Sequence, residues 1–246
     1  MSIRTAEELQ KLRAIGKIVR LSLDKMTASV RSGITTAELD EIGVQVLAAH
    51  GAEAAPRKVY GFPGGVCISV NDEAVHGVPG DRVLRDGDLV KLDLVAAKDG
   101  FFADAAVTVP VGRVSTGAEA LARCAEAAFW KAMKVARVGF RTSHIGREVE
   151  REARRQGFNV IPELGGHGVG RTIHEEPSVP NFDDQCSRAR LLKGLVLAVE
   201  PIITSGKGRA VLSADGWTIR TADSTLSAHY EHTIVVTNGA PLLLTA

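Results

Sequence analysis

The feature that most constrains the fold lies in residues 87–112, where two β-rich runs flank Asp99-Gly100. An Asp-Gly pair between such runs is the strongest short-range signal for a β-hairpin. A two-residue turn pairs Asp93 with Ala106 and places Asp104 on the same face, diagonal to Asp93. Diagonal neighbours lie about 7–8 Å apart at the backbone, so both carboxylates can reach one ion.

Two further carboxylates interrupt segments that otherwise read as strands. Glu200 lies in LVLAVEPIIT, residues 195–204, and Glu231 lies in SAHYEHTIVVT, residues 227–237. Burying one unpaired carboxylate costs roughly several kcal/mol of folding free energy, because the charge loses its hydration. A single buried carboxylate can be explained by a loop that it caps or by an arginine with which it pairs. Four carboxylates on predicted strands need a shared positive charge. Two divalent cations would balance them, and an oxygen-rich set with one imidazole suits Mn, Fe or Co and also accommodates Zn.

The order of the predicted elements indicates an α+β fold. Two helices precede strands and two more helices precede further strands, which predicts two similar halves within a single domain. The halves are roughly residues 1–112 and 113–246, and the domain is residues 1–246. The other predicted elements are a helix from Thr5 to about Ser32, a shorter helix that begins at the Thr35 capping box, a strand at VCISVN, and helices over roughly 117–137 and 143–156.

The composition excludes several classes of partner. Thirty Lys and Arg residues against 29 Asp and Glu give a net charge of +1, which provides no attraction to nucleic acid or to an anionic membrane. Three cysteines without a CxxC pair argue against a disulfide framework and a thiolate zinc site. Neither a signal-peptide core nor an apolar run of membrane-spanning length is present. We therefore expect a cytoplasmic protein that binds neither nucleic acids nor membranes.

The stretch ELGGHGVGRTIHEEP, residues 163–177, places His167 and His174 among glycines. A metal site, a phosphate cradle and a flexible loop are all compatible with its composition. The absence of GxGxxG in any frame, and of a Lys-Ser or Lys-Thr pair, excludes the phosphate cradle, and the absence of HExxH excludes a helix-borne zinc site. The glycines would let the backbone pass close to a site. His76, in NDEAVHGVPG, is compatible with a structural or a catalytic role.

Five motifs taken in order resemble those of the bacterial type I methionine aminopeptidases. They are NDEAVHGVPG, KLDLVAAKDGFFAD, GGHGVGRTIHEEP, AVEP and SAHYEHTIVV, and together they span nearly the whole chain. The resemblance implies the pita-bread fold, two pseudo-symmetric helix-helix-strand halves around a central antiparallel sheet. It implies a metallo-aminopeptidase that removes the initiator methionine from nascent proteins and peptides with a small second residue. The implied protein is a monomer that makes transient contact with the ribosome.

The resemblance also implies a site, residue by residue. The implied ligands of two divalent ions (Co, Mn, Fe or Zn) are Asp93, Asp104, His167, Glu200 and Glu231. Asp104 and Glu231 would bridge the ions, Asp93 would bind one ion, and His167 with Glu200 would bind the other. The implied substrate contacts are Phe62, Cys67, His76, Ile173, His174 and Trp217, of which the apolar members would form a pocket suited to a thioether. Glu175 and Glu176 are not expected to be ligands.

The resemblance suggests a mechanism for these residues. A water molecule activated by the metal ions would attack the peptide carbonyl. Glu200 would act as the general base while remaining a ligand. His76 and His174 would be catalytic as hydrogen-bond donors to the developing charge and to the peptide nitrogen.

Two departures from the family pattern concern the surroundings of these residues. Alanines at 103, 105 and 106 flank Asp104, where familiar members carry a small hydroxylated or glycine-rich neighbourhood. A missing hydroxyl would change the hydrogen bonds around the ligand and therefore metal affinity or choice. Phe62 replaces a more usual tyrosine, a milder change.

Two rival functions remain open. One is an Xaa-Pro aminopeptidase or dipeptidase, which would use the same five ligands. The other is a non-catalytic pita-bread binding protein, which the loss of a ligand would mark. All five candidate ligands are present in the sequence.

Overall fold

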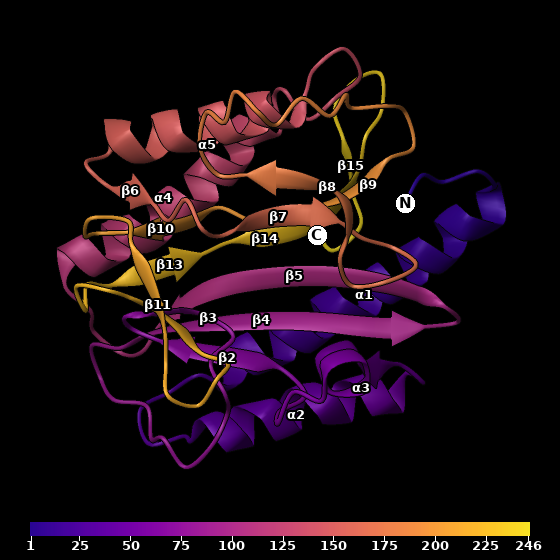
Figure 1. Ribbon diagram of the computed structural model, residues 1–246. Coiled ribbons are helices and arrows are strands. Elements are labelled where there is room, and N and C mark those ends of the chain that lie inside the picture. Colours follow the sequence, from indigo (N-terminus) through magenta and orange to yellow (C-terminus); the bar gives the residue numbers. More distant parts are fainter.

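The computed structural model describes residues 1–246 as five helices and fifteen strands (Figure 1). The helices are α1 (Ala6–Ser29), α2 (Thr36–Ala49), α3 (Ala55–Tyr60), α4 (Thr116–Ala132) and α5 (Thr142–Arg155). The strands are β1 (Glu53–Ala54), β2 (Cys67–Val70), β3 (Glu73–Val75), β4 (Leu89–Lys98), β5 (Phe101–Pro110), β6 (Asn159–Val160), β7 (Gly165–Gly168), β8 (Glu175–Pro180), β9 (Val196–Val199), β10 (Ile202–Thr204), β11 (Ala210–Leu212), β12 (Ile219–Thr221), β13 (Ser227–His229), β14 (Glu231–Val235) and β15 (Leu242–Leu243).

A nine-stranded antiparallel sheet forms the centre of the molecule. Its strands follow the order β1-β4-β5-β14-β9-β7-β8, with β2 paired to β4 and β15 paired to β14. Because β5 pairs with β14, the sheet joins the earlier and the later part of the chain. Two three-stranded sheets, β13-β10-β6 and β11-β12-β3, flank it.

The predicted β4–β5 hairpin is confirmed in both turn and register. Asp93 pairs with Ala106, and the turn residues Asp99 and Gly100 have φ angles of 51° and 78°. Positive φ at both central positions is the mark of a type I′ turn, whose twist matches that of the strands it joins. Asp104 lies two residues from Ala106 and therefore faces the same side as Asp93.

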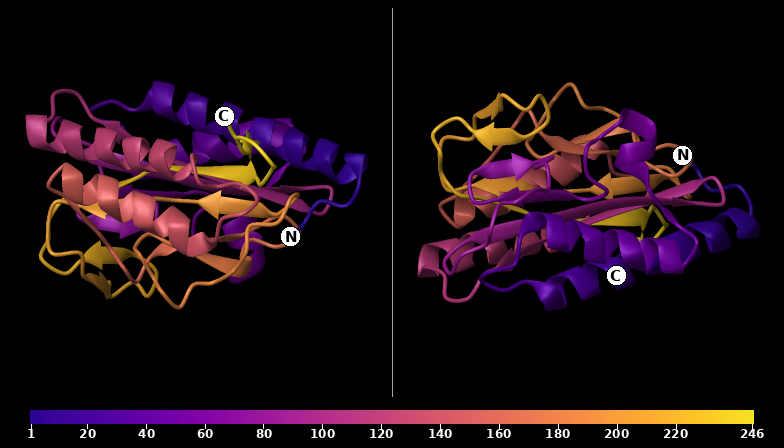
Figure 2. Two further views of the ribbon diagram at one scale, coloured as in Figure 1. Left: turned by 90° about the horizontal axis from the view of Figure 1, so that it is seen from above. Right: turned by 90° about the horizontal axis from the view of Figure 1, so that it is seen from below.

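The long helices leave one face of the central sheet free for a site. α1 and α4 lie behind the sheet in Figure 1, with α2 below and α5 above, whereas α3 and the small sheet β11-β12-β3 lie on the opposite side (Figure 2). Along β4, Leu92 and Leu94 are buried in the core under the helices. Strand alternation turns Asp93 to the other face. No helix is both long and apolar enough to cross a lipid bilayer.

Two of the predicted strands are each broken in the middle. The segment 195–204 forms β9 and β10, and the segment 227–237 forms β13 and β14. In each pair one strand belongs to the central sheet and the other to the sheet β13-β10-β6. The breaks are joined by a hydrogen bond from the Tyr230 N–H to the Pro201 carbonyl, 3.2 Å. Pro201 has no N–H to continue a strand ladder, so the chain changes sheet directly after Glu200.

Two predicted helices end earlier than expected. α1 ends at Ser29 rather than near Ser32, and α4 ends at Ala132 rather than near residue 137. After α1 the Val30 N–H bonds to the Thr27 carbonyl, and after α4 the N–H groups of Lys134 and Val135 bond to carbonyls three residues back instead of four. Such tightened turns satisfy the last carbonyls and stop the helix. α2 begins directly after the predicted Thr35 cap, and α5 begins and ends within one residue of the predicted limits.

Candidate metal centre and substrate pocket

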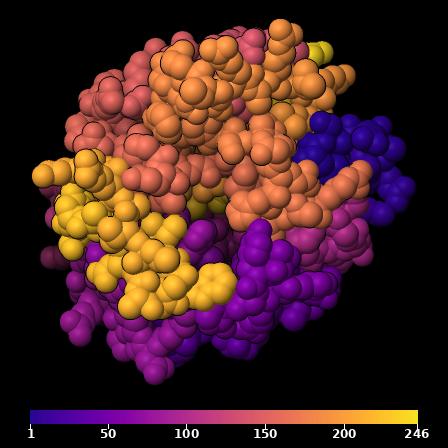
Figure 3. Space-filling model, in the orientation of Figure 1, coloured from indigo at the N-terminus to yellow at the C-terminus, as the bar shows by residue number.

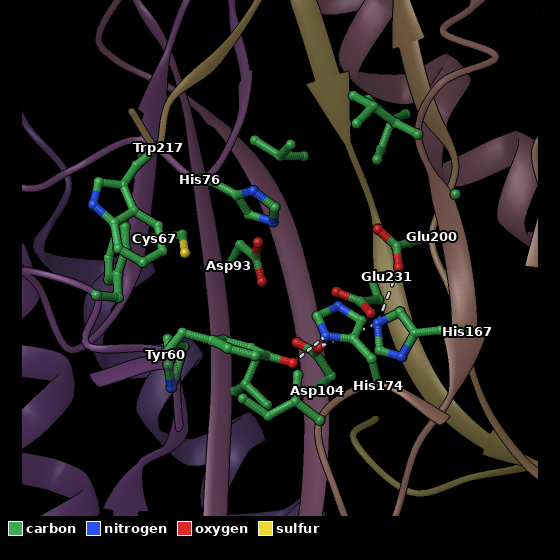
Figure 4. A pocket seen from close by; sticks show the side chains of 18 of the residues that line it. Tyr60, Cys67, His76, Asp93, Asp104, His167, His174, Glu200, Trp217 and Glu231 are labelled. Carbon is green, nitrogen blue, oxygen red and sulfur yellow. Dashed lines mark hydrogen bonds and ion pairs between the residues drawn. The ribbon is translucent and has the colours of Figure 1, made fainter. Parts of the chain in front are cut away.

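Five neighbouring strands of the central sheet each present one of the predicted metal ligands. In the order of the strands across the sheet, the ligands are Asp93 on β4, Asp104 on β5, Glu231 on β14, Glu200 directly after β9, and His167 on β7. All five side chains line one cavity (Figure 4).

The register of the strands explains why these side chains meet. Ala106 pairs with Asp93 on one side and with Glu231 on the other. His167 pairs with Ala198, two residues before Glu200, so their side chains share a face of the sheet. One nitrogen of His167 and one carboxylate oxygen each of Asp104 and Glu231 lie within 4.8 Å of one another.

The carboxylates of this cluster hold their protons more tightly than ordinary acids. Burial raises the pKa of Asp93 to about 7. Burial first, and repulsion between the carboxylates second, raise the pKa of Asp104, Glu200 and Glu231 well above their usual values. No lysine or arginine lines the cavity to offset these charges. Ionisation of the cluster therefore depends on a cation from outside the chain.

His167 adds a lone pair to the same cluster. Its Nδ1 lies 2.9 Å from the Gly168 carbonyl oxygen, and because a carbonyl only accepts, Nδ1 carries the proton. Burial, followed by repulsion from other histidines, lowers the pKa of His167 to about 4, so the ring is neutral. The unprotonated Nε2 then lies 3.4 Å from Glu200 Oε1 and 3.9 Å from Asp104 Oδ2. Acceptors facing one another in this way are stabilised only by protons or a cation between them.

The donor set fits divalent metal ions. It offers four carboxylates and one imidazole, a combination suited to Mn, Fe, Co or Zn. Asp104 Oδ1 and Glu231 Oε1 are buried without any hydrogen-bond partner. Buried polar atoms are nearly always satisfied, so two orphaned oxygens on candidate ligands are compatible with a bound cation.

All eleven predicted site residues line this cavity, which has a volume of about 200 Å³. It opens in the hollow where the purple, orange and yellow parts of the chain meet in Figure 3. Besides the five candidate ligands, these residues are Phe62, Cys67, His76, Ile173, His174 and Trp217. Their presence in one cavity is observed, whereas the role of each stays a prediction.

The backbone of His76 is strained where it enters the cavity. Its φ angle is 57°, a left-handed conformation that residues with a side chain rarely adopt. The following Gly77 approaches the backbone of β2 so closely that a Cβ would lie 2.3 Å from the Ile68 carbonyl oxygen. Strain of this kind collects at functional sites, where the surrounding structure maintains it. Burial and the nearby His174 lower the pKa of His76, so its ring is neutral.

Tyr60 is a cavity residue that the sequence did not reveal. Its hydroxyl lies 2.7 Å from Nδ1 of His174, whose ring centroid is 4.2 Å from that of His167. Tyr60 ends the six-residue helix α3, which has no periodic pattern long enough to predict. The contact could therefore be found only from the fold.

The far end of the cavity is apolar. Phe62 and Trp217 meet edge to face, with ring centroids 5.3 Å apart, and Trp217 lies near the buried thiol of Cys67 (Figure 4). Asp215 fixes this wall, because its Oδ1 accepts hydrogen bonds from the N–H groups of Trp217 and Thr218, each at 2.9 Å. An unbranched apolar side chain matches such a lining.

The glycine-rich stretch is neither a flexible loop nor a phosphate cradle. It forms β7, a turn and β8, and β7 lies between β8 and β9. A Cβ at Gly166 would lie 2.2 Å from the Ala198 carbonyl oxygen, and one at Gly168 would lie 2.4 Å from that of Glu176. Glycine is therefore required for the close approach that delivers His167. Glu175 accepts hydrogen bonds from two N–H groups of the turn and does not line the cavity.

The surroundings of Asp104 match the departure noted in the sequence. The alanines at 103, 105 and 106 are buried and offer no side-chain donor to its carboxylate. Thr233 of β14 instead bonds the backbone, accepting from the Asp104 N–H and donating to its carbonyl, both at 2.8 Å. The backbone of this candidate ligand is therefore held firmly, while its Oδ1 stays free of hydrogen bonds.

Comparison with known proteins gives consistent matches. Residues 10–238 match metallopeptidase family M24. The chain is 43% identical to methionine aminopeptidase 2 of Bacillus subtilis, covering 100% of this chain and 99% of that protein. It is 41% identical to the methionine aminopeptidase of Clostridium perfringens, covering 99% and 98% respectively.

A solved structure agrees with these matches. The crystal structure of methionine aminopeptidase from Thermotoga maritima superimposes with a TM-score of 0.96 at 34% identity. The match covers 100% of this chain and 99% of that one. The predicted α+β pita-bread fold is thereby confirmed.

Proposed function

The chain belongs to metallopeptidase family M24, within the methionine aminopeptidases, and we propose that it removes the initiator methionine from nascent proteins and peptides whose second residue is small. The observation that carries the proposal is the cluster of buried and half-buried carboxylates around the lone pair of His167, in a cavity that no lysine or arginine lines. Every predicted ligand lies in that cluster, which argues against a non-catalytic binding protein.

The five candidate ligands would hold two divalent ions, Co, Mn, Fe or Zn. Asp104 and Glu231 lie centrally and would bridge the ions, Asp93 would serve one, and His167 with Glu200 the other. Bound ions would supply Lewis acidity, which lowers the pKa of a water molecule and polarises the scissile carbonyl. Glu200, whose carboxylate lines the cavity, would accept the proton of the attacking water.

The two neutral histidines outside the ligand set would bind the reacting peptide. Tyr60 donating to Nδ1 of His174 would leave Nε2–H as the donor toward the carbonyl oxygen. His76 would donate a hydrogen bond to the nitrogen of the scissile peptide bond. The methionine side chain would occupy the apolar end formed by Phe62, Cys67, Ile173 and Trp217.

Removing the donor of His174 should affect turnover more than binding. We expect His174→Ala to lower kcat by about 10²- to 10³-fold with a small change in KM, because the lost hydrogen bond strengthens as charge develops. Steady-state kinetics on a Met-Ala-Ser peptide measure both constants. A raised KM with an unchanged kcat would assign His174 to ground-state binding instead.

Metal affinity should fall as the pH is lowered through about 7. The raised pKa values mean that Asp93 and its neighbours bind protons near neutral pH, and a metal ion must displace those protons. Calorimetric titration with Mn²⁺ in two buffers of different ionisation enthalpy measures the protons released. Binding that is equally tight at about pH 6 and pH 8, without proton release, would contradict the assigned ligands.

The substrate proposal is tested with peptides. Protein stripped with a chelator and reloaded with Mn, Co, Fe or Zn is incubated with Met-Ala-Ser, with a peptide that begins with alanine, and with an Xaa-Pro peptide. We expect methionine release from the first peptide only. Cleavage of the Xaa-Pro peptide would favour the rival peptidase, and no release with any metal would favour a binding protein.

We also propose that residues 1–246 act as one monomeric catalytic domain in the cytoplasm, without nucleic-acid or membrane binding. The cavity takes residues from both halves, 1–112 and 113–246, which supports a single domain. The net charge of +1 supports the absence of polyanionic partners. Transient contact with the ribosome would bring nascent N-termini to the cavity. Sedimentation of the free protein, and its cosedimentation with ribosomes, test these two points.

A further inference from the structure

A second imidazole lies directly behind the candidate metal ligands. His229, the last residue of β13, is 1% exposed and does not line the cavity. Its Nε2 lies 3.7 Å from Glu200 Oε2 and 3.7 Å from Glu231 Oε2. Neither ring nitrogen has a hydrogen-bond partner. An imidazole buried with both nitrogens unpaired is costly, so its retention needs a reason.

The strand that carries His229 is held by two polar side chains of the β4–β5 hairpin, half-buried Thr108 and buried Lys91. Thr108 Oγ1 accepts a hydrogen bond from the His229 N–H and donates one to its carbonyl oxygen, both 2.8 Å. Lys91, paired with Thr108 across β4 and β5, donates to the Ser227 carbonyl at the other end of β13, 3.3 Å away. Both ends of this short strand are therefore anchored to the hairpin that carries two of the candidate ligands.

The carboxylate of Glu200 lies between two imidazoles with different roles. Its Oε1 faces the unprotonated Nε2 of His167, and its Oε2 faces Nε2 of His229. Since His229 Nε2 is equidistant from two acceptor oxygens, and its Nδ1 has no acceptor, the N–H of the neutral ring belongs on Nε2. A donor then stands behind both glutamates, on the side away from His167.

We propose that His229 is a positioning residue: its Nε2–H, 3.7 Å from Oε2 of Glu200 and of Glu231, would close to hydrogen-bond distance when metal ions are bound and so orient both carboxylates toward the ions. The proposal rests on the proposed metal centre. A hydrogen bond from a neighbouring residue fixes the rotamer of a metal ligand. Metal binding then costs less side-chain entropy. His229 makes no contact with substrate in this role, and its effect on turnover is indirect.

The test measures metal binding rather than activity. Chelator-stripped protein is titrated with Mn²⁺ by calorimetry for the wild type, His229→Phe and His229→Gln. Phenylalanine keeps an aromatic ring without a donor, whereas glutamine keeps an N–H. We expect His229→Phe to raise the Kd by about 10- to 100-fold and His229→Gln to lie nearer the wild type. The visible absorption of the Co²⁺ form should change in the phenylalanine variant alone.

His232→Phe is the matched control. His232 is also buried, on the adjoining β14, but its nitrogens bond to Thr245 and Tyr230 instead of facing the ligands. Its replacement should lower the unfolding midpoint while leaving the Kd for Mn²⁺ unchanged. Equal losses in the His229→Phe and His232→Phe variants would overturn the proposal, because the effect would then be general destabilisation.

A second variant covers the case in which His229→Phe does not fold. Thr108→Val removes both hydrogen bonds to the His229 backbone without touching a ligand and should weaken Mn²⁺ binding in the same direction. A wild-type Kd in whichever of these two variants folds overturns the positioning role and leaves the metal centre intact. A wild-type protein that binds no Mn²⁺ in the cavity overturns both.

Discussion

Replacing Glu200 with glutamine is expected to lower kcat for methionine release by about 10²- to 10⁴-fold, the usual contribution of a positioned general base. The Glu200 carboxylate lines the cavity and can accept a proton, whereas an amide at the same place cannot. Glutamine keeps an oxygen at nearly the same position as a weaker metal ligand. The loss should therefore persist at saturating metal, as a fall in kcat with little change in KM.

The measurement is steady-state kinetics on Met-Ala-Ser across a range of Mn²⁺ concentrations. Glu176→Gln is the control, since Glu176 is an exposed acid of the same glycine-rich segment and does not line the cavity. The control should match the wild type. A Glu200→Gln variant with full kcat at saturating metal would remove the base role and leave Glu200 as a ligand only.

Asp104→Asn should abolish tight metal binding while preserving the fold. Asp104 is central in the cluster and would bridge both ions, so its loss should exceed the roughly 10- to 100-fold effect of an outer hydrogen-bond partner. The folded-state pKa of Asp104 is raised well above its ordinary value, so its stabilising contribution is present at low pH and is lost as the pH rises. Asparagine mimics the protonated acid at every pH.

Two readouts separate these effects. Calorimetry with Mn²⁺ should show the loss of affinity. In the presence of a chelator, the unfolding midpoint of Asp104→Asn should equal that of the wild type at or below about pH 4, the ordinary pKa of the carboxyl, and exceed it at about pH 8. A variant that is less stable than the wild type at both pH values would show that Asp104 has a structural partner, contrary to the unpaired Oδ1.

The hairpin of β4 and β5 was predictable because local chemistry determines it. Asp99 and Gly100 adopt the positive φ values that a two-residue turn requires, and strand alternation then fixes which residues face the site. The alternation of side chains along the paired strands was enough to predict that Asp93 and Asp104 face the same side of the sheet. The five motifs then extended the prediction to ligands on strands far apart in the sequence, and these do lie in one cavity.

Long-range contacts account for what the sequence did not reveal. The chain breaks at Glu200 and at Tyr230 because both segments pass from one sheet to the other at neighbouring positions. The sequence of either segment alone does not show where the other segment changes sheet. Tyr60 reaches His174 from a helix too short to have a periodic pattern. His229 stands two residues before Glu231, so alternation could have marked it, but a histidine on a strand is equally compatible with a plain core position.

Five side chains would hold two divalent ions, and an anomalous difference map from crystals of the Mn²⁺-loaded protein tests this most directly. We predict two peaks in the cavity, with Asp93 at one, His167 and Glu200 at the other, and Asp104 and Glu231 touching both. A cavity without peaks, or peaks held by other residues, would contradict it.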